Sequence, residues 1–194
     1  MMKLACIMLA AGRGSRFGGK KQLARIDGQA MVARSLGEVQ PLFPNDTYVV
    51  LGAYEDQVRS VLPAACRVLH HQNWADGLGA SLAFGMKALE GYDGVLVTLA
   101  DQVALKQADF ERMIDPFDGT SIVSAHYKDK HAVPTLFPAS FFDQLKGLSG
   151  DRGAQKLLKE NLDRIVSVKM ACAAIDIDTQ DDLLEYGKRH HDAA

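Results

Sequence analysis

The stretch Lys3–Ala10 (KLACIMLA), followed by the glycine-rich segment Ala11–Lys21 (AGRGSRFGGKK), decides the fold. An apolar run of this length that ends in a glycine-rich loop predicts a strand buried on both faces, which is typical of a parallel sheet covered by helices. Gly94–Ala100 (GVLVTLA) is a second run of this kind, and Asp101 stands at its carboxyl end. The sequence therefore predicts a buried sheet with polar side chains beyond its strand ends.

Outward from these two strands, the apolar pattern predicts alternating strands and helices. Further strands are expected at residues 47–51, 67–69, 121–125, 133–137 and 164–168, and helices at 31–40, 55–62, 81–89, 139–146, 153–161 and 179–190. Such alternation favours a mostly parallel, Rossmann-like sheet with helices on both faces. We expect an α/β protein with a single three-layer α/β/α domain over residues 1–194.

The composition excludes several classes of protein. The 194 residues carry a formal net charge of -2, without the clustered excess of Lys and Arg that indicates a nucleic-acid partner. No stretch reaches the roughly 18 apolar residues of a membrane span, and the short apolar N-terminus lacks the pattern of a signal peptide. Three widely spaced cysteines match neither a disulfide framework nor a zinc site. We expect a cytoplasmic protein that binds neither nucleic acid nor membrane.

The loop after the first strand has the composition of a phosphate-binding site. Open α/β sheets bind ligands beyond the carboxyl ends of their strands, and this is the first such loop. Glycines let its backbone approach a ligand closely, and free N–H groups in such a turn form an anion-binding concavity; they are Gly12, Gly14, Gly18 and Gly19. Positive charge comes from Arg13, Arg16, Lys20 and Lys21. Together these features predict a triphosphate site.

Two other phosphate-binding loops come close to this pattern and do not fit. Residues 14–20 match a P-loop up to its lysine, but Lys21 occupies the position at which Ser or Thr must hold Mg²⁺. The dinucleotide fingerprint requires G-x-G-x-x-G, whereas Gly12, Gly14 and Gly18 leave one residue too many. The spacing therefore disfavours a P-loop enzyme and a nicotinamide-dependent oxidoreductase.

The loop resembles the L-A-A-G-x-G-x-R-x-G-x-x-K signature of the MobA-like nucleotidyltransferases. The matching residues, which the resemblance implies to be mostly nucleotide-binding, are Leu9, Ala10, Ala11, Gly12, Gly14, Arg16, Gly18 and Lys21. The resemblance implies a fold of the nucleotide-diphospho-sugar transferase type, in which the backbone of residues 9–12 meets the base and ribose. Arg16 and Lys21 would then bind the phosphates and stabilise the leaving pyrophosphate.

Four later segments resemble the same family in the same order. Residues 73–82 (NWADGLGASL) resemble a segment of the cytidylyltransferase branch that lies against the base. This resemblance implies nucleotide contacts from Asn73, Gly79 and Ser81. Trp74 is either a packing anchor or a platform for the base. The other segments are LADQ at 99–102, GDRGA at 150–154 and DIDTQDDL at 176–183. The chain is therefore identified as a member of the MobA-like family, in the branch of molybdenum cofactor cytidylyltransferases.

Two carboxylates are expected to hold Mg²⁺, which prefers oxygen ligands and commonly takes one or two carboxylates together with substrate phosphate and water. Asp101 is the first ligand, and with Arg16 and Lys21 it forms the predicted catalytic set. Asp178 is preferred as the second ligand from the resemblance, and Asp176 is the alternative because the two alternate along an extended segment. Asp178 also precedes the last expected helix, where Asp is a good N-cap.

The acceptor site is less closely defined. The loop that contains Asp151 and Gly153 opens an expected helix, whose free N–H groups and dipole suit a phosphate of the acceptor; Asp151 is equally suited to cap that helix. Pro134 stands where the family has a Gly-x-Pro turn that lines the acceptor pocket, but Ala132 replaces its glycine. The resemblance therefore specifies the nucleotide better than the acceptor.

These features predict a magnesium-dependent transfer in which a phosphate oxygen of the acceptor attacks the α-phosphorus of CTP and pyrophosphate leaves. The resemblance implies molybdopterin as the acceptor, and a molybdoenzyme or its insertion chaperone as a protein partner. Transfer to methylerythritol phosphate or to a sugar 1-phosphate is the alternative within the same chemistry. A non-catalytic protein that delivers a finished cofactor is the alternative from a different class.

Overall fold

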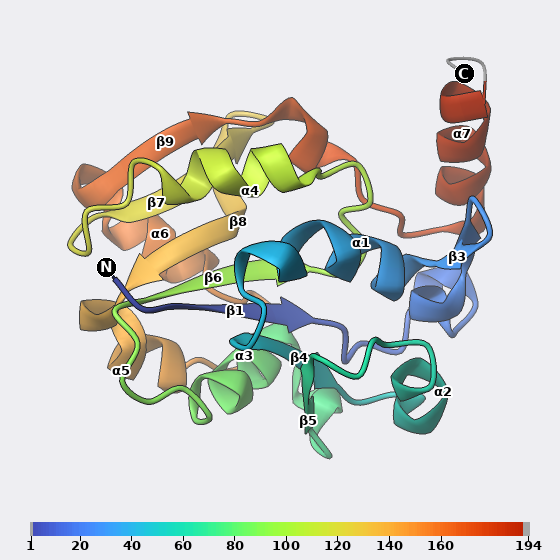
Figure 1. Cartoon of the computed structure of the whole chain (residues 1–194), viewed down its shortest axis with the longest axis horizontal. Coiled ribbons are helices and arrows are strands. Elements are labelled where there is room, and N and C mark those ends of the chain that lie inside the picture. Colours follow the sequence, from blue (N-terminus) through green and yellow to red (C-terminus); the bar gives the residue numbers. More distant parts are fainter. Residues whose placement is uncertain (1, 192–194) are drawn as a thin grey trace.

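A seven-stranded, mostly parallel sheet forms the centre of the protein (Figure 1). The computed structural model describes residues 2–191. The sheet order is β5-β4-β1-β6-β8-β7-β9, and its strands are β1 (Leu4–Leu9), β4 (Thr47–Leu51), β5 (Arg67–His70), β6 (Gly94–Leu99), β7 (Ile122–Tyr127), β8 (Lys130–Pro138) and β9 (Ile165–Lys169). All neighbouring pairs are parallel except those made by β8, which runs antiparallel to β6 and β7.

Helices cover both faces of the sheet. The apolar cluster on one face includes side chains of α1 (Met31–Val39), α2 (Glu55–Arg59) and α4 (Gln107–Ile114). The cluster on the other face includes α3 (Leu78–Met86), α5 (Phe142–Lys146) and α6 (Gln155–Glu160). The last helix, α7 (Gln180–His191), stands to one side, past the carboxyl end of β1 (Figure 1). The predicted three-layer α/β/α fold is confirmed.

Strand β1 shows why an unbroken apolar run forms the middle of this sheet. Successive side chains of a strand point to opposite faces. Cys6 and Met8 accordingly pack in the cluster that contains α1 and α4, whereas Ala5, Ile7 and Leu9 pack in the cluster that contains α3. All five are at most 5% exposed. Because neither face meets water, the strand has no polar alternation.

A third apolar cluster brings together three segments that are far apart in the sequence. It is made by Phe17, Ile26, Met31, Val103, Ile177 and Tyr186. These residues come from the segment between β1 and the start of α1, from the segment after β6 and from the region around α7. The cluster therefore fixes the positions of the strand-end segments relative to each other, and these segments build the site described below.

Two elements are absent from the sequence-based prediction. A small hairpin of β2 (Arg25–Ile26) and β3 (Gln29–Ala30) precedes α1, and helix α4 follows β6. Helix α4 has eight residues and buries only Phe110 and Met113, so its apolar periodicity is too short to stand out. Within residues 2–191, each helix is too short or too polar to cross a membrane.

Candidate active site

A cavity of about 780 Å³ opens at the carboxyl ends of β1 and β6. This is the edge at which open α/β sheets bind ligands, since the connections that leave the strands form a crevice there. The cavity is lined by Leu9, Ala10, Ala11, Gly12, Arg13, Gly14, Ser15, Arg16, Lys21, Gln22, Met31, Trp74, Ala75, Gly77, Leu78, Ser81, Leu99, Ala100, Asp101, Lys130, Asp151, Gln155, Asp176 and Asp178.

The glycine-rich loop forms one wall of this cavity. Gly14 and Gly18 have φ angles of 68° and 92°, in the left-handed region that glycine adopts without strain. A Cβ on Gly14 would lie 2.8 Å from the Cβ of Lys21, so glycine here allows the loop to fold back against that lysine. Within residues 2–191, the N–H groups of Gly12 and Gly14 donate to no protein atom, which leaves them free to bind an anion.

A buried glutamine holds the loop in this shape. The side chain of Gln22 is 4% exposed, and its Nε2 donates hydrogen bonds to the carbonyl oxygens of Ala10, at 2.9 Å, and of Gly12. These bonds fix the backbone path of residues 10–12 along the cavity. Sequence reasoning did not single out Gln22, because a polar residue between Lys21 and Leu23 carries no signal of burial.

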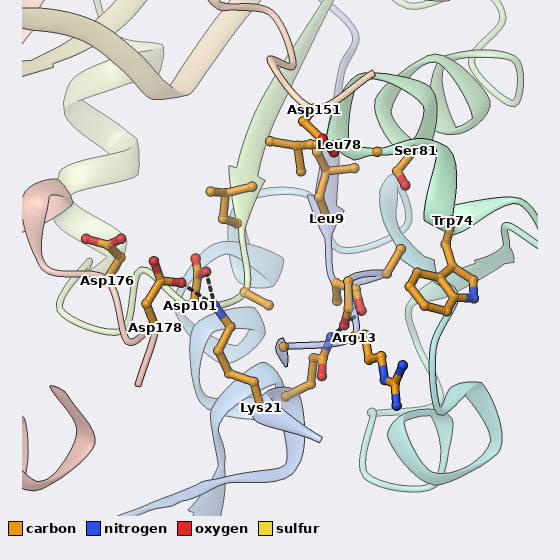
Figure 2. A pocket seen from close by; sticks show the side chains of 18 of the residues that line it. Leu9, Arg13, Lys21, Trp74, Leu78, Ser81, Asp101, Asp151, Asp176 and Asp178 are labelled. Atoms are coloured by element: carbon orange, nitrogen blue, oxygen red, sulfur yellow. Dashed lines mark hydrogen bonds and ion pairs between the residues drawn. The ribbon is translucent and has the colours of Figure 1, made fainter. Parts of the chain in front are cut away.

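Four charged side chains meet in the cavity, and Figure 2 shows three of them, Lys21, Asp101 and Asp178. The ammonium Nζ of Lys21 lies 2.7 Å from Oδ2 of Asp101 and 2.9 Å from Oδ1 of Asp178. The other oxygen of Asp178, Oδ2, accepts a hydrogen bond from Nη1 of Arg16 at 3.0 Å. The predicted catalytic residues Arg16, Lys21 and Asp101 therefore lie together, and Asp178 joins them from the far end of the chain.

The start of α7 positions Asp178. The carboxylate of Asp182 accepts hydrogen bonds from the backbone N–H groups of Asp178 and Thr179, while the Thr179 hydroxyl accepts one from the N–H of Asp182. This reciprocal arrangement is a capping box with Thr179 as the N-cap. The backbone N–H of Ile177 donates to the carbonyl oxygen of Asp101 at 3.2 Å. The Asp178 side chain is thus free of capping and faces Lys21.

Burial dominates the electrostatics of Asp101. Burial raises the pKa of this carboxyl group, the adjacent Lys21 ammonium opposes the rise, and the negative charges of Asp178 and Asp176 add to it. Asp176 lines the same cavity, but its carboxylate lies beyond Asp178, on the side away from Lys21 (Figure 2). A partly buried carboxylate of this kind requires a cation beside it.

The wall opposite the glycine loop carries Trp74 and Ser81. A Cβ on Gly52 would overlap the Cβ of Trp74, so this glycine makes room for the tryptophan. The hydroxyl oxygen of Ser81 lies 3.2 Å from Nδ1 of His71, whose ring stacks on Phe84 with centroids 4.7 Å apart. Trp74 thus packs on Gly52 and Ser81 on His71, while both side chains face the cavity (Figure 2).

Two glycines at the start of α3 allow a second loop to dock there. The backbone N–H of Gly79 donates to the carbonyl oxygen of Gly150 at 2.7 Å. A Cβ on Gly77 would lie 2.6 Å from Oδ1 of Asp151. The docked loop therefore presents the Asp151 carboxylate to the cavity. The loop precedes α6, which is only six residues long. Of the residues expected to contact the acceptor in this loop, Asp151 lines the cavity and Gly153 does not; an acceptor phosphate at this loop stays a prediction.

Four residues predicted to contact substrates do not line the cavity. Asn73 lines a separate cavity of about 410 Å³ that also contains His71. Gly79 packs against the 149–150 backbone, as described above. Pro134 follows a cis peptide bond within β8, and Gly153 contacts Leu78. In contrast, Lys130 at the start of β8 lines the cavity and was not predicted, since nothing in the sequence places this hairpin beside β6.

The donor set fits a hard divalent cation. Oδ1 of Asp101 is buried without a hydrogen-bond partner, and Asp101 and Asp178 together supply the carboxylate oxygens that such cations prefer. No cluster of three or more His, Cys, Asp or Glu side chains within residues 2–191 is arranged to hold a metal ion. The remaining ligands would therefore come from substrate phosphate and water.

A family model of the MobA-like NTP transferase domain matches residues 6–165, which include the glycine-rich loop and Asp101. The chain belongs to the MobA-like NTP transferase family. This membership assigns the domain to the nucleotidyltransferase class of enzymes.

Relatives that are similar in sequence to this chain have different names. GlmU, a bifunctional protein from Corynebacterium diphtheriae, is 32% identical over 139 residues, which cover 68% of this chain and 26% of GlmU. This chain therefore matches about a quarter of that relative. Nicotine blue oxidoreductase from Paenarthrobacter nicotinovorans is 28% identical over 165 residues, covering 79% of this chain and 80% of the relative. PucB, a purine catabolism protein from Bacillus subtilis, is 29% identical over 116 residues, 57% of this chain and 56% of its own.

Solved structures share the fold of this chain over nearly their whole length. A nucleotidyl transferase from Methanothermobacter superposes with a TM-score of 0.83 at 22% identity, covering 99% of both chains. Rv0371c from Mycobacterium tuberculosis has a TM-score of 0.82 at 24% identity, covering 96% of this chain and 98% of its own. At these identities the likeness establishes the fold.

Proposed function

We propose that this chain transfers a nucleotidyl group from a nucleoside triphosphate to a small phosphorylated acceptor, with Mg²⁺ as the metal. The supporting observation is the position of Lys21 between Asp101 and Asp178, at 2.7 and 2.9 Å, beside a glycine loop with free N–H groups. A pair of carboxylates next to an anion-binding loop matches the needs of a metal-bound triphosphate.

The cavity offers different chemistry at its two ends. Trp74 and Ser81 provide an aromatic face and a hydroxyl group where the base would lie against the backbone of residues 9–12. The triphosphate would follow the loop toward Arg16 and Lys21. These two cations stand near the carboxylate pair and would neutralise charge that develops on the leaving pyrophosphate.

The chain's own residues would act mainly by positioning. A phosphate oxygen of the acceptor attacks the α-phosphorus, a new P–O bond forms, the bond to the β-phosphate oxygen breaks, and pyrophosphate leaves with that electron pair. The attacking phosphate is already ionised at neutral pH, so no general base is needed. Asp101 and Asp178 would hold Mg²⁺, which supplies Lewis-acid polarisation of the α-phosphate when bound. Alignment of the two substrates provides most of the remaining rate.

The finer form of the proposal is transfer of CMP from CTP to molybdopterin by a cytoplasmic enzyme whose domain spans residues 1–194. It is supported by the resemblance of residues 73–82 and 150–154 to the cytidylyltransferase branch. Methylerythritol phosphate and sugar 1-phosphates remain the other acceptors of the same chemical class, and a molybdoenzyme or its insertion chaperone is the proposed protein partner.

Pyrophosphate release tests the proposal. The purified chain is incubated with Mg²⁺, each of the four nucleoside triphosphates and each candidate acceptor. CTP with molybdopterin should release pyrophosphate, and the Asp101→Asn variant should not. If pyrophosphate is released only with another triphosphate or acceptor, the result would support nucleotidyl transfer and refute the assignment of CTP and molybdopterin as the substrates. No release from any pair, or equal release from Asp101→Asn, would refute the function.

The similarity to nicotine blue oxidoreductase motivates a second candidate, a redox function, because the match covers 80% of that relative. The glycine spacing of residues 12–18 does not fit a dinucleotide fingerprint, which makes this candidate the weaker one. Oxidation of NADH or NADPH in the presence of quinone or dye acceptors tests it directly; we expect no turnover.

A further inference from the structure

Lys21 occupies the place that the proposed function gives to a metal ion. Its ammonium contacts one oxygen of each carboxylate, Oδ2 of Asp101 and Oδ1 of Asp178. The three side chains are 14%, 18% and 31% exposed, respectively, so the cluster is mostly shielded from water. Two carboxylates in such surroundings repel each other strongly unless a cation lies between them.

The lysine is well suited to be that cation. Its Nζ donates a hydrogen bond to each carboxylate, at 2.7 Å to Oδ2 of Asp101 and 2.9 Å to Oδ1 of Asp178. It cannot, however, share the site with a second cation. A divalent ion bound by the same two oxygens would lie within a few ångströms of Nζ, where repulsion is large at a half-buried position.

We propose that Lys21 is the resident counter-ion of the carboxylate pair, and that a divalent cation enters this pair only when the lysine leaves it for the triphosphate. This inference rests on the proposed function. It predicts that the free protein binds divalent cations weakly, and that nucleotide and metal strengthen each other's binding.

The local geometry allows this exchange. Lys21 is the first residue of a short 3-10 turn, and its Cβ packs beside Gly14 within the glycine loop. A rotation of its long side chain, without movement of the backbone, would carry the ammonium toward the loop's free N–H groups, where phosphates are expected. Oδ1 of Asp101 has no hydrogen-bond partner and would be available to the incoming cation. The side chain of Arg16 is 79% exposed, so its guanidinium group could leave Asp178 and bind the phosphates as well.

Manganese binding to the purified chain, measured by electron paramagnetic resonance at pH 8, tests this exchange. Without nucleotide, wild-type protein should bind Mn²⁺ weakly, and Lys21→Met should bind it at least about tenfold more tightly because a positive charge within about 4 Å has been removed. Addition of CTP should tighten Mn²⁺ binding to the wild type and change the affinity of Lys21→Met much less.

Lys20→Met is the matched control. Lys20 lies next to Lys21 on the same loop, its Nζ stands 5.9 Å from the ring centroid of Tyr54, and it does not line the cavity that holds the carboxylate pair. The control removes the same charge and should keep the weak wild-type affinity. Lys21→Arg should also bind Mn²⁺ weakly, and Asp101→Asn in the Lys21→Met background should abolish the gain. Thermal melting verifies that each variant is folded.

The outcomes separate the counter-ion role from the proposed reaction. Equal Mn²⁺ affinity of wild type, Lys20→Met and Lys21→Met would overturn the counter-ion role, even if the wild type releases pyrophosphate. Tight Mn²⁺ binding to the free wild type would overturn it too. A gain in Lys21→Met without any pyrophosphate release by the wild type would support the counter-ion role and refute the reaction.

Discussion

Gly52 and Trp74 are in such close contact that a methyl group on the Gly52 Cα would overlap the Cβ of Trp74. Gly52 follows strand β4, and Trp74 follows β5, its parallel neighbour. The glycine thus lets the tryptophan settle at the strand ends, where it lines the cavity. Because the chain contains a single tryptophan, this contact makes Trp74 a specific reporter of the site.

We predict that nucleotide binding changes the intrinsic fluorescence of Trp74 in a saturable way. Titration of CTP with Mg²⁺ measures the change, and Trp74→Phe should abolish the signal while leaving binding detectable by calorimetry. Gly52→Ala should shift the emission without ligand, weaken CTP binding and cost about 1–3 kcal/mol of stability through overpacking. An unchanged spectrum at saturating CTP would place the nucleotide away from Trp74.

The three aspartates beyond the strand ends should differ in importance. Asp101→Asn should lower turnover by at least about two to three orders of magnitude, the scale of losing a key electrostatic stabiliser. Asp178→Asn should be similarly severe because its carboxylate also contacts Lys21. Asp176→Asn is the matched control and should retain most activity, since this carboxylate lies away from Lys21 (Figure 2). A larger loss in Asp176→Asn than in Asp178→Asn would reverse the choice of the second metal ligand.

The strands were predictable from the sequence because their burial is visible in the residues themselves. Residues 47–51 (TYVVL) are wholly buried and form β4 with the predicted limits. The missed hairpin of β2 and β3 did carry a signal: its turn residues Asp27 and Gly28 have φ angles of 51° and 79°, and Asp-Gly is a typical pair for such a turn. The turn between β7 and β8, with Lys128 and Asp129 at positive φ, lies where the polar residues 127–131 predict a turn between two strands, and Asp tolerates this conformation.

The site was predictable in part. The glycine loop and Asp101 stand directly after apolar strands, so their position follows from the strand prediction. The choice between capping and site contact at Asp178 depends on Asp182, which takes the capping role with Thr179. Lys130 and Gln22 depend on tertiary contacts between segments far apart in the sequence, and such contacts leave no local pattern.

Glycine at position 79 should be required for docking of the 149–151 loop. A Cβ there would lie 2.7 Å from the carbonyl oxygen of Ser149 and 2.9 Å from that of Gly150, so Gly79→Ala should cost about 1–3 kcal/mol and weaken substrate binding. The matched control is Gly37→Ala in helix α1, where a Cβ meets nothing within 4 Å. Because alanine favours helix, the control should gain up to about 1 kcal/mol. Urea denaturation measures both, and equal stabilities would refute the docking role.

The stability of the protein should fall on the acid side because of His71. Its side chain is 7% exposed, and burial lowers its pKa from the ordinary value of 6.5. The unfolded chain therefore takes up this proton at a higher pH than the folded one, and the free energy of unfolding decreases as pH falls below about 6.5 until the folded pKa is passed. Burial also lowers the pKa of His131, so the two residues act in the same direction.

Urea denaturation of the wild type and His71→Gln at pH 7.5 and pH 5 measures this contribution. The glutamine cannot be protonated and can still bond to the Ser81 hydroxyl group, so the variant should lose less stability between the two pH values than the wild type does. His70→Gln is the control, because His70 is the neighbouring residue and its side chain is 42% exposed. This variant should lose as much stability between pH 7.5 and pH 5 as the wild type does, because it retains His71. Parallel losses in the wild type and His71→Gln would show that the imidazole beside Ser81 is not the group that responds to acid.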